Sequence, residues 1–215
     1  MGRPKKTEPA AGIRERILEA AKEQFADHGL EQASVRAITD RARANSSMLG
    51  YYYGSKEELF REVIGSIVGG LVRHRLAAVE QLRLEYPSTI PLERLLHAYA
   101  EPVLTTGHPL ERDVAIYLRF FGRLYTEPSD RLRELIQSQM TEVQQVYLLE
   151  IGRSAPHLDA ATLTFRFGLL MGSLAFLGAR VGVIELLSDG AMQSSPSEDT
   201  LQRFTRDFAA LFAMP

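Results

Sequence analysis

The chain has 215 residues, 45% of them hydrophobic and 24% charged, which suffices for one large domain or for a small domain fused to a medium one. It contains no cysteine, which excludes disulfide frameworks, thiolate zinc sites and cysteine nucleophiles and fits a cytoplasmic protein. The net charge is −2, but residues 1–56 carry ten Lys/Arg against seven Asp/Glu, whereas residues 57–215 carry fifteen against twenty. A mildly basic N-terminal segment therefore precedes an acidic remainder.

Neither export nor membrane insertion is indicated. The first twelve residues are charged and lack the apolar segment of a secretory signal. The most apolar run, Phe167 to Ala179, is shorter than the ~20 residues that a membrane span needs, and it predicts a buried helix instead.

Apolar residues recur at steps of three and four along the whole chain, which predicts an all-α fold of about nine helices. The first helix is expected from about Gly12 to His28, with Gly29 as a left-handed cap at its C-terminus. Its inward stripe consists of Ile13, Ile17, Ala21 and Phe25.

Two short helices separated by a tight turn follow. Ser34 is a good N-cap for the first of them, which places Val35, Ile38 and Ala42 inward and Arg36, Arg41 and Arg43 outward. Asn45 or Ser46 can cap the second, SSMLGYY, which ends before Tyr53 and Gly54. This spacing is typical of a helix-turn-helix.

A long helix begins at the capping box formed by Ser55 and Glu58 and is expected to reach Arg83. Leu59, Val63, Ile67 and Leu71 recur on it at steps of four, so it should connect the N-terminal segment rigidly to the rest. The predicted units are residues 1–11 as a flexible basic arm, 12–58 as a DNA-binding domain with its helix-turn-helix at about 33–53, and 59–215 as a regulatory and dimerisation domain.

The remaining helices are separated by loops rich in Gly, Pro and Ser. The first of them should be kinked or broken at Pro102, which lacks an amide donor. The expected ranges are Pro91–Leu104, Leu110–Tyr125, Asp130–Ile151, Asp159–Leu187 and Glu198–Phe212.

The N-terminal third resembles a known family. Three motifs occur together at fixed spacing. The first is a helix with an Arg-Ile-Leu run and a later Phe-x-x-x-Gly, the second is a Ser-Val pair before an Ile, and the third is a second short helix that ends in tyrosines before Ser-Lys-Glu. These residues are Arg16, Ile17, Leu18, Phe25, Gly29, Leu30, Ser34, Val35, Ile38, Tyr51, Tyr52, Tyr53, Ser55, Lys56 and Glu57. As a set, residues 10–72 resemble the DNA-binding head of the TetR family of transcriptional regulators.

Two positions depart from the common family pattern. Many members have tyrosine where this chain has Gly50, and Gly-Val where it has Arg43-Ala44. Asn45 at the start of the second short helix and Tyr53-Gly54-Ser55-Lys56 after it resemble a subgroup that ends this helix with Tyr-His-Phe-Gly-Ser-Lys. We take Gly50 as the end of that helix or, as a second reading, as a point of close approach to DNA.

The resemblance implies that the second short helix enters the major groove of an operator. Small polar residues at its leading end suit that approach, and tyrosine and lysine suit contacts to phosphate. The candidate DNA-binding residues are Ser34, Arg36, Arg43, Asn45, Ser46, Ser47, Tyr51, Tyr52 and Lys56. Leu49 and Tyr53 are expected to be packed inside the head instead. The Gly2-Arg3-Pro4-Lys5-Lys6 leader is either a minor-groove arm or a free cationic tail.

The resemblance also implies a homodimer formed by the last two long helices. One helix carries small residues at steps of four and three, which would let another helix approach closely, either in the partner or within one subunit. The candidate interface comprises Gly168, Gly172, Ala175, Ala179, Gly182, Phe204 and Phe208.

An unknown small-molecule effector is expected in the C-terminal domain, where aromatic side chains cluster. The candidate ligand-binding residues are Tyr99, Glu101, Tyr117, Phe120, Phe121, Tyr147, Phe167 and Met171, with His97 and Arg119 as further polar anchors. A ligand would act by changing the separation of the two heads through the helix that begins at Lys56, so that they no longer fit a palindromic operator.

Other functional classes are less well supported by the residues. Glu93 and His97 share a helical face, but the five histidines are scattered and no nucleophile, phosphate loop or third metal ligand accompanies them. We therefore expect no enzyme, no cofactor and no metal. The alternative to a DNA-binding regulator is a dimeric helical ligand-binding or adaptor protein without specific DNA binding.

Overall fold

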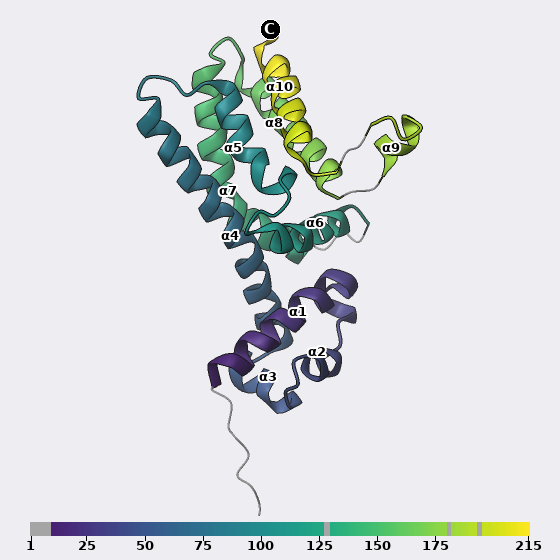
Figure 1. Cartoon of the computed structure of the whole chain (residues 1–215). Coiled ribbons are helices and arrows are strands. Elements are labelled where there is room, and N and C mark those ends of the chain that lie inside the picture. The colour runs from purple at the N-terminus through teal and green to yellow at the C-terminus, as the bar shows by residue number, and fades with distance from the viewer. Residues whose placement is uncertain (1–9, 127–129, 180–181, 193–194) are drawn as a thin grey trace, which may run out of the picture.

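A computed structural model of the chain describes residues 10–126, 130–179, 182–192 and 195–215. These residues form ten helices and no strand, which confirms the all-α fold and the expected number of about nine helices (Figure 1). The leader at residues 2–6 and most of the predicted arm lie outside the described residues.

The N-terminal head consists of α1 (Ala10–Gln32), α2 (Val35–Arg41) and α3 (Ser46–Tyr53). Ile17, Phe25, Ile38 and Leu49 are buried between these helices, because each falls on the inward stripe of its own helix. The chain kinks at Gly29, whose φ of 70° is the left-handed conformation expected there. A second, short helical stretch then continues to Gln32, so the first stretch ends at Gly29, as predicted.

The long helix α4 (Lys56–Glu85) runs from the head into the larger body (Figure 1). It begins as expected, since the Ser55 hydroxyl accepts the Glu58 amide at 3.1 Å. The Phe60 ring meets Phe25 of the head at 5.0 Å and Phe120 of the body at 5.9 Å between centroids. Apolar packing is therefore continuous from one part of the molecule to the other.

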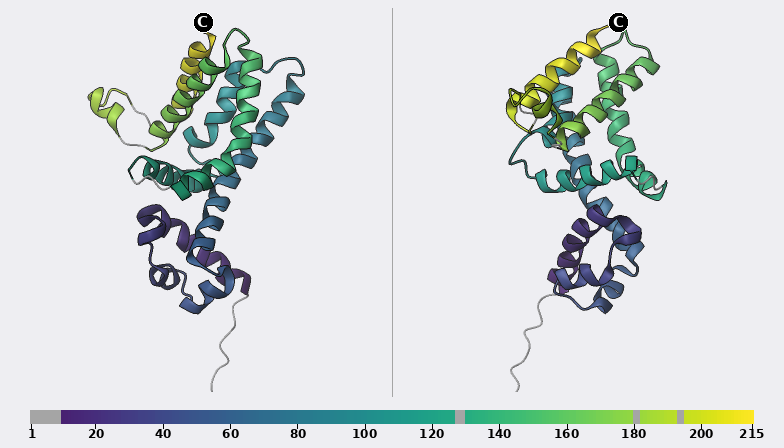
Figure 2. Two further views of the ribbon diagram at one scale, coloured as in Figure 1. Left: turned by 180° about the vertical axis from the view of Figure 1, so that it is seen from behind. Right: turned by 90° about the vertical axis from the view of Figure 1, so that its right-hand side faces the viewer.

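The body consists of α5 (Leu92–Leu104), α6 (Glu111–Thr126), α7 (Asp130–Ser154), α8 (Ala160–Gly178), α9 (Val183–Leu187) and α10 (Glu198–Ala213). Helix α5 packs against α4, α7, α8 and α10. Helix α6 crosses the base of the body and contacts both α1 and α4, so it separates the head from the other body helices (Figure 2). The C-terminus lies at the end of the molecule opposite the head.

Two sequence predictions of helix ends are wrong. The segment Asp159–Leu187 is not one helix, because α8 ends at Gly178 and Gly182 takes a left-handed φ of 69° before α9. Gly50 is not the end of α3 either. The helix continues to Tyr53 and is capped by Gly54, whose φ is 76° and whose amide bonds to the Gly50 carbonyl.

Helix α5 continues through Pro102 to Leu104 and is not broken there. The proline lies in the last turn of the helix, so only one intrahelical bond is lost before the helix ends.

Helix α8 is long and apolar enough to cross a membrane by length and composition alone. The expectation that it is a buried helix is met only on one side, because 17% of its most apolar window is buried within this chain. Phe165, Leu169 and Phe176 on its other side are exposed.

Candidate functional site

The turn between α2 and α3 is tightly hydrogen-bonded. Arg43 has a left-handed φ of 51°, and the amides of Arg43 and Ala44 bond to the carbonyls of Asp40 at 3.1 Å and Thr39 at 2.9 Å. The Ser34 hydroxyl caps α2 by accepting the Ala37 amide at 3.2 Å, as predicted. These bonds fix α3 relative to α2, which is what a helix-turn-helix requires.

Helix α3 presents a polar leading end to solvent. The Asn45 side chain caps it by accepting the Ser47 amide at 3.2 Å, while Ser46 and Ser47 are exposed. Leu49 is buried, as predicted, and Met48 is half-buried. Tyr51, one turn further along, is 82% exposed.

Eight of the nine candidate DNA-binding residues lie on α2, α3 and the adjoining turns, and Lys56 is the first residue of α4. All of them are exposed except Tyr52 and Lys56, which are half-buried. Arg36 makes one contact of 3.7 Å, to the neighbouring Asp40. The Lys56 ammonium has a different environment, because it donates to the carbonyls of Glu31 at 3.1 Å and Ala33 at 3.2 Å. It thus joins the start of α4 to the corner between α1 and α2.

Tyr53 is packed inside the head, as predicted. Its hydroxyl donates to the Arg14 carbonyl at 2.6 Å, and the Arg14 guanidinium lies 5.2 Å from the ring centroid. Burial raises the pKa of Tyr53 to about 12, so this hydroxyl remains a donor at neutral pH.

Ion pairs join the head to the body, a feature that sequence reasoning missed. Lys22 of α1 is 5% exposed and pairs with Asp113 of α6 at 2.9 Å. Arg119 of α6, expected as a ligand anchor, instead pairs with Glu23 at 2.5 Å and Asp27 at 2.7 Å. The Arg119 hydrogen bond is also the main cause of a lowered pKa at Glu23. Acidic residues at steps of four along α1 were the sequence signal for this contact.

An internal cavity of about 260 Å³ lies among α4, α5, α6, α7 and α8. Four of the eight candidate ligand-binding residues line it: Tyr99, Tyr117, Phe121 and Met171. The others do not line it. Phe120 packs on Phe60, Tyr147 and Phe167 pack edge-on against the Tyr99 ring, and Glu101 lies in a separate cluster.

Arg75 of α4 also lines this cavity, although it is 2% exposed. Sequence reasoning did not select it. The signal was present nonetheless, because Arg75 falls four residues after Leu71 and four before Val79, on the buried stripe of α4. A lone basic residue on such a stripe needs a buried partner or a ligand.

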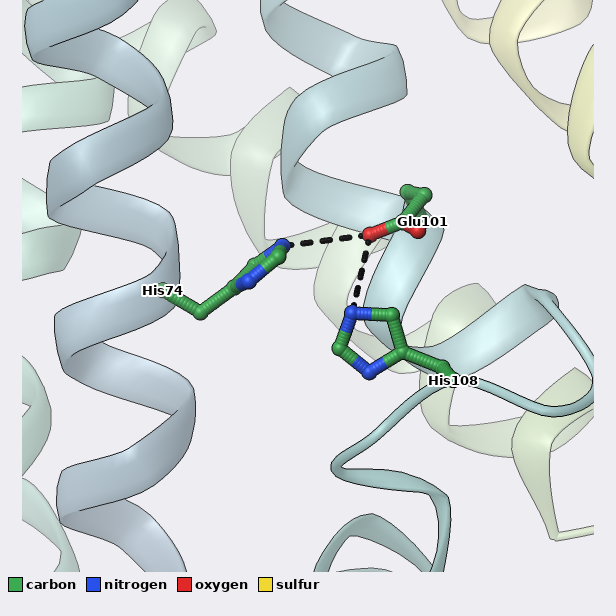
Figure 3. Close-up of side chains that lie close together, drawn as sticks. All are labelled: His74, Glu101 and His108. Carbon is green, nitrogen blue, oxygen red and sulfur yellow. Dashed lines mark hydrogen bonds and ion pairs between the residues drawn. The ribbon is translucent and has the colours of Figure 1, made fainter.

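Glu101 lies between two histidines that are far apart in the sequence, as Figure 3 shows. Its Oε2 is 3.1 Å from His74 Nε2 and 3.4 Å from His108 Nε2. The histidines are scattered in the sequence, but the fold places His74, Glu101 and His108, three potential metal ligands, within 4.8 Å of one another. However, His108 Nδ1 accepts the Leu110 amide at 3.0 Å, so the proton of a neutral ring is on Nε2 and faces Glu101. A metal ion needs a free Nε2 lone pair. The observed geometry therefore fits a hydrogen-bonded network better than a metal centre.

The exposed side of α8 and one side of α10 line a groove of about 710 Å³. Gly168 and Gly172 face it, and a side chain added at either would meet nothing within 4 Å. Phe204 and Phe208 of α10 pack against each other there at 4.6 Å and also line it. Of the other interface candidates, Ala175 lines the internal cavity, and Ala179 and Gly182 follow α8.

Two family models match the chain. The model described as bacterial regulatory proteins of the tetR family covers residues 17–63, and the one described as the tetracyclin repressor-like C-terminal domain covers residues 97–210. The chain belongs to the TetR family. The second match spans more than half of the sequence, and the first coincides with the helix-turn-helix and the start of α4.

Individual relatives agree with this assignment. The chain is 47% identical over 49 residues to the HTH-type transcriptional repressor SCO4008 of Streptomyces coelicolor, which is 23% of this chain and 26% of the relative. It is 26% identical over 134 residues to the HTH-type transcriptional repressor KstR2 of Mycolicibacterium smegmatis, 62% of this chain and 58% of that protein. The chain therefore spans less than two thirds of the length of these relatives. A solved structure from Pseudomonas aeruginosa PAO1 shares the fold, with a TM-score of 0.66, 15% identity and coverage of 96% and 93% of the two chains.

Proposed function

We propose that this TetR-family protein is a dimeric transcriptional repressor that binds a palindromic operator and is released from it by a small molecule. The observation that carries the proposal is the capped and tightly turned α2–α3 unit, which exposes Ser46, Ser47 and Tyr51 and is fixed to α4. Such a unit suits major-groove entry, with Arg36 and Arg43 beside it for phosphate or base contacts. The proposed role needs no catalysis and would be carried out on DNA in the cytoplasm.

The dimer forms through the groove side of α8 and α10. A single chain leaves Phe165, Leu169 and Phe176 exposed beside Gly168 and Gly172, and an apolar surface of this kind is costly in water. The small residues let a second helix approach closely, and no described atom of the same chain lies within 4 Å of a Cβ added at Gly168 or Gly172. A partner copy related by twofold symmetry would bury this surface.

Effector release follows from the position of the cavity. Its wall includes α4, and the first turns of α4 pack against the head through Phe60 and Lys56. We place the division between DNA-binding and regulatory parts within α4, after residue 58. A ligand that shifts α4 would change the separation of the two heads and favour a spacing that does not fit the operator.

The test is selection of bound sequences from random duplexes by the purified protein at near-physiological salt, where phosphate attraction alone does not dominate. We expect an imperfect palindrome with half-sites ~34–36 Å apart or a multiple of that spacing. If the folded, ligand-free protein enriches no sequence, the proposal is wrong and the chain is better described as a ligand-binding or adaptor protein.

A further inference from the structure

Arg75 is a buried charge for which the described residues provide no counter-charge. Its Nε donates to the Tyr99 carbonyl at 3.0 Å, and its guanidinium carbon lies 3.7 Å from the centroid of the Tyr99 ring. Among the described residues, no carboxylate lies within ion-pair distance of it, and its two terminal nitrogens donate no hydrogen bond. Such a guanidinium is expensive to bury, since a paired charge is the usual condition for burial.

The described lining of the cavity beside Arg75 supplies a second positive charge instead of a negative one. Arg133 stands at its wall, Gln137 and Gln144 supply amides, and none of the described residues that line it is an aspartate or glutamate. The rest of the wall is apolar or aromatic and includes Val103, Ile136, Met140 and Leu174. A cationic ligand would be repelled there, and a neutral one could accept hydrogen bonds from Arg75 but would not balance its charge.

We propose that the effector of this protein is a small organic anion, a monocarboxylate with an apolar body, whose carboxylate pairs with Arg75. The planar guanidinium matches a carboxylate through two parallel hydrogen bonds, while the apolar body fills the space toward α7 and α8. The volume of about 260 Å³ is slightly below the roughly 300–1,000 Å³ of typical ligand pockets, which limits the effector to a small compound. This inference rests on the proposed ligand-responsive function and names its ligand class.

The position of Arg75 also links the bound anion to the helix that carries the head. Its side chain bonds to α5 at Tyr99, and its own carbonyl accepts the Tyr147 hydroxyl of α7 at 3.2 Å. An anion that accepts hydrogen bonds from the two terminal guanidinium nitrogens would therefore bind where α4, α5 and α7 meet. This makes α4 the first element to respond.

The experiment compares acids with their neutral amides on the full-length dimer by isothermal titration calorimetry. The probes are benzoate, hexanoate, octanoate and 4-phenylbutyrate, each paired with its primary amide of nearly equal size. We expect at least one acid to bind about tenfold or more tightly than its amide, because a charge-assisted pair replaces a neutral contact. Equal binding of acid and amide, or no binding of any of the four acids, overturns the proposal.

Two variants locate the effect. Arg75→Met keeps an unbranched, flexible side chain, although a shorter one, and removes the charge, so it should abolish the preference for acid over amide, whereas Arg75→Lys should retain part of it. Arg73→Met is the matched control, because Arg73 is an exposed arginine on the same helix and does not line the cavity, and it should change acid affinity by less than about threefold. If Arg75→Met unfolds, the acid–amide comparison on the unaltered protein still decides the question.

The outcome is separable from that of the proposed function. Calorimetry needs no operator, so the acid preference can be measured even if no palindrome is selected. Conversely, a selected palindrome with no acid preference would leave the repressor intact and overturn only the ligand class.

Discussion

Gly50 and Gly54 lie four residues apart, but the backbone accommodates a Cβ at Gly50 and disfavours one at Gly54. Gly50 is helical and a Cβ there meets nothing within 4 Å, whereas Gly54 caps α3 with a φ of 76° and a Cβ there would collide with the Glu58 carboxylate. We expect Gly50→Ala to raise the free energy of unfolding by roughly 0.5–1 kcal/mol and Gly54→Ala to lower it by about 1 kcal/mol or more. Urea denaturation of both variants checks this. Equal effects would contradict the assigned end of α3.

Experiments can also distinguish whether Lys56 stabilises the fold or contacts DNA. Because its ammonium bonds to the carbonyls of Glu31 and Ala33, Lys56→Met should cost about 1 kcal/mol of stability, while Arg36→Gln on the exposed face of α2 should cost almost nothing. The salt dependence of operator binding should show the opposite order, with the larger effect for Arg36→Gln and the smaller one for Lys56→Met. We expect the slope of log affinity against log salt to fall by about 1 for Arg36→Gln if it contacts a phosphate, and to stay nearly unchanged for Lys56→Met. Fluorescence anisotropy with a labelled operator at several salt concentrations gives both slopes.

Residue-level predictions from sequence succeeded where the interaction is local. Ser34, Asn45 and Ser55 all cap the helices that follow them, because a cap depends only on residues two or three positions ahead. Gly50 was misread because glycine is unfavourable in a helix only by a small energy, which capping by Gly54 outweighs. The contact of Glu101 with His74 and His108 depends on three separate segments, and spacing within one helix cannot reveal it.

At the scale of elements, α6 connects the body to the head, because it packs against α1. Arg112 and Arg119 on it face the acidic residues of α1, and their side chains are 61% and 40% exposed. Pairs as exposed as these contribute little to stability, about 1 kcal/mol or less each. Their position between the two parts suggests that they set the orientation of the head.

We expect Arg112→Gln combined with Arg119→Gln to weaken ligand-induced release from the operator while changing overall stability by less than about 2 kcal/mol. Arg94→Gln is the matched control, since Arg94 is 54% exposed and pairs with Glu85 at 3.8 Å at the far end of α4. Operator affinity with and without effector, measured for both, is the readout. A full ligand response in the double variant would show that α6 does not transmit the signal.

The same contact predicts a pH dependence. Because the Arg119 bond lowers the pKa of Glu23 below its ordinary value of 4.5, the ionised carboxylate contributes stability above that pH, and this contribution is lost as the pH falls through the lowered value. The stability difference between the unaltered protein and Arg119→Gln should therefore be present at pH 7 and shrink below about pH 4.5. Thermal unfolding across pH 3.5–7 measures it, and a constant difference would argue against this pair.

Prediction of elements from periodicity was accurate for α4, α7 and α10, whose apolar stripes are long and regular. It failed between α8 and α9, because small and apolar residues continue across the break and only the left-handed backbone of Gly182 marks it. Which helices touch was not predictable, so the α1–α6 ion pairs and the position of Arg75 in the cavity appeared only with the fold.

For the whole molecule, the unusual property is that the most apolar helix is one of the least covered. Within one chain, Leu169 is 45% and Phe165 is 68% exposed, which makes little sense for an isolated subunit in water. A symmetric dimer resolves this, because the same surface on two copies would be buried at once. In the proposed dimer, this contact would also set the spacing of the two heads on an operator.

The dimer is tested by placing a charge where a partner helix must approach. Gly172 is exposed, helical and has no atom within 4 Å of an added Cβ, so Gly172→Glu should leave the fold of one chain intact. We expect sedimentation velocity to show monomers and operator affinity to fall at least about 100-fold, since two half-sites are then bound separately. Gly122→Glu is the matched control, because Gly122 is also an exposed helical glycine with open space but lies on α6, outside the groove. If Gly172→Glu remains dimeric while circular dichroism shows an unchanged helical fold, the α8 groove is not the interface, and the exposed side of α8 requires a different partner.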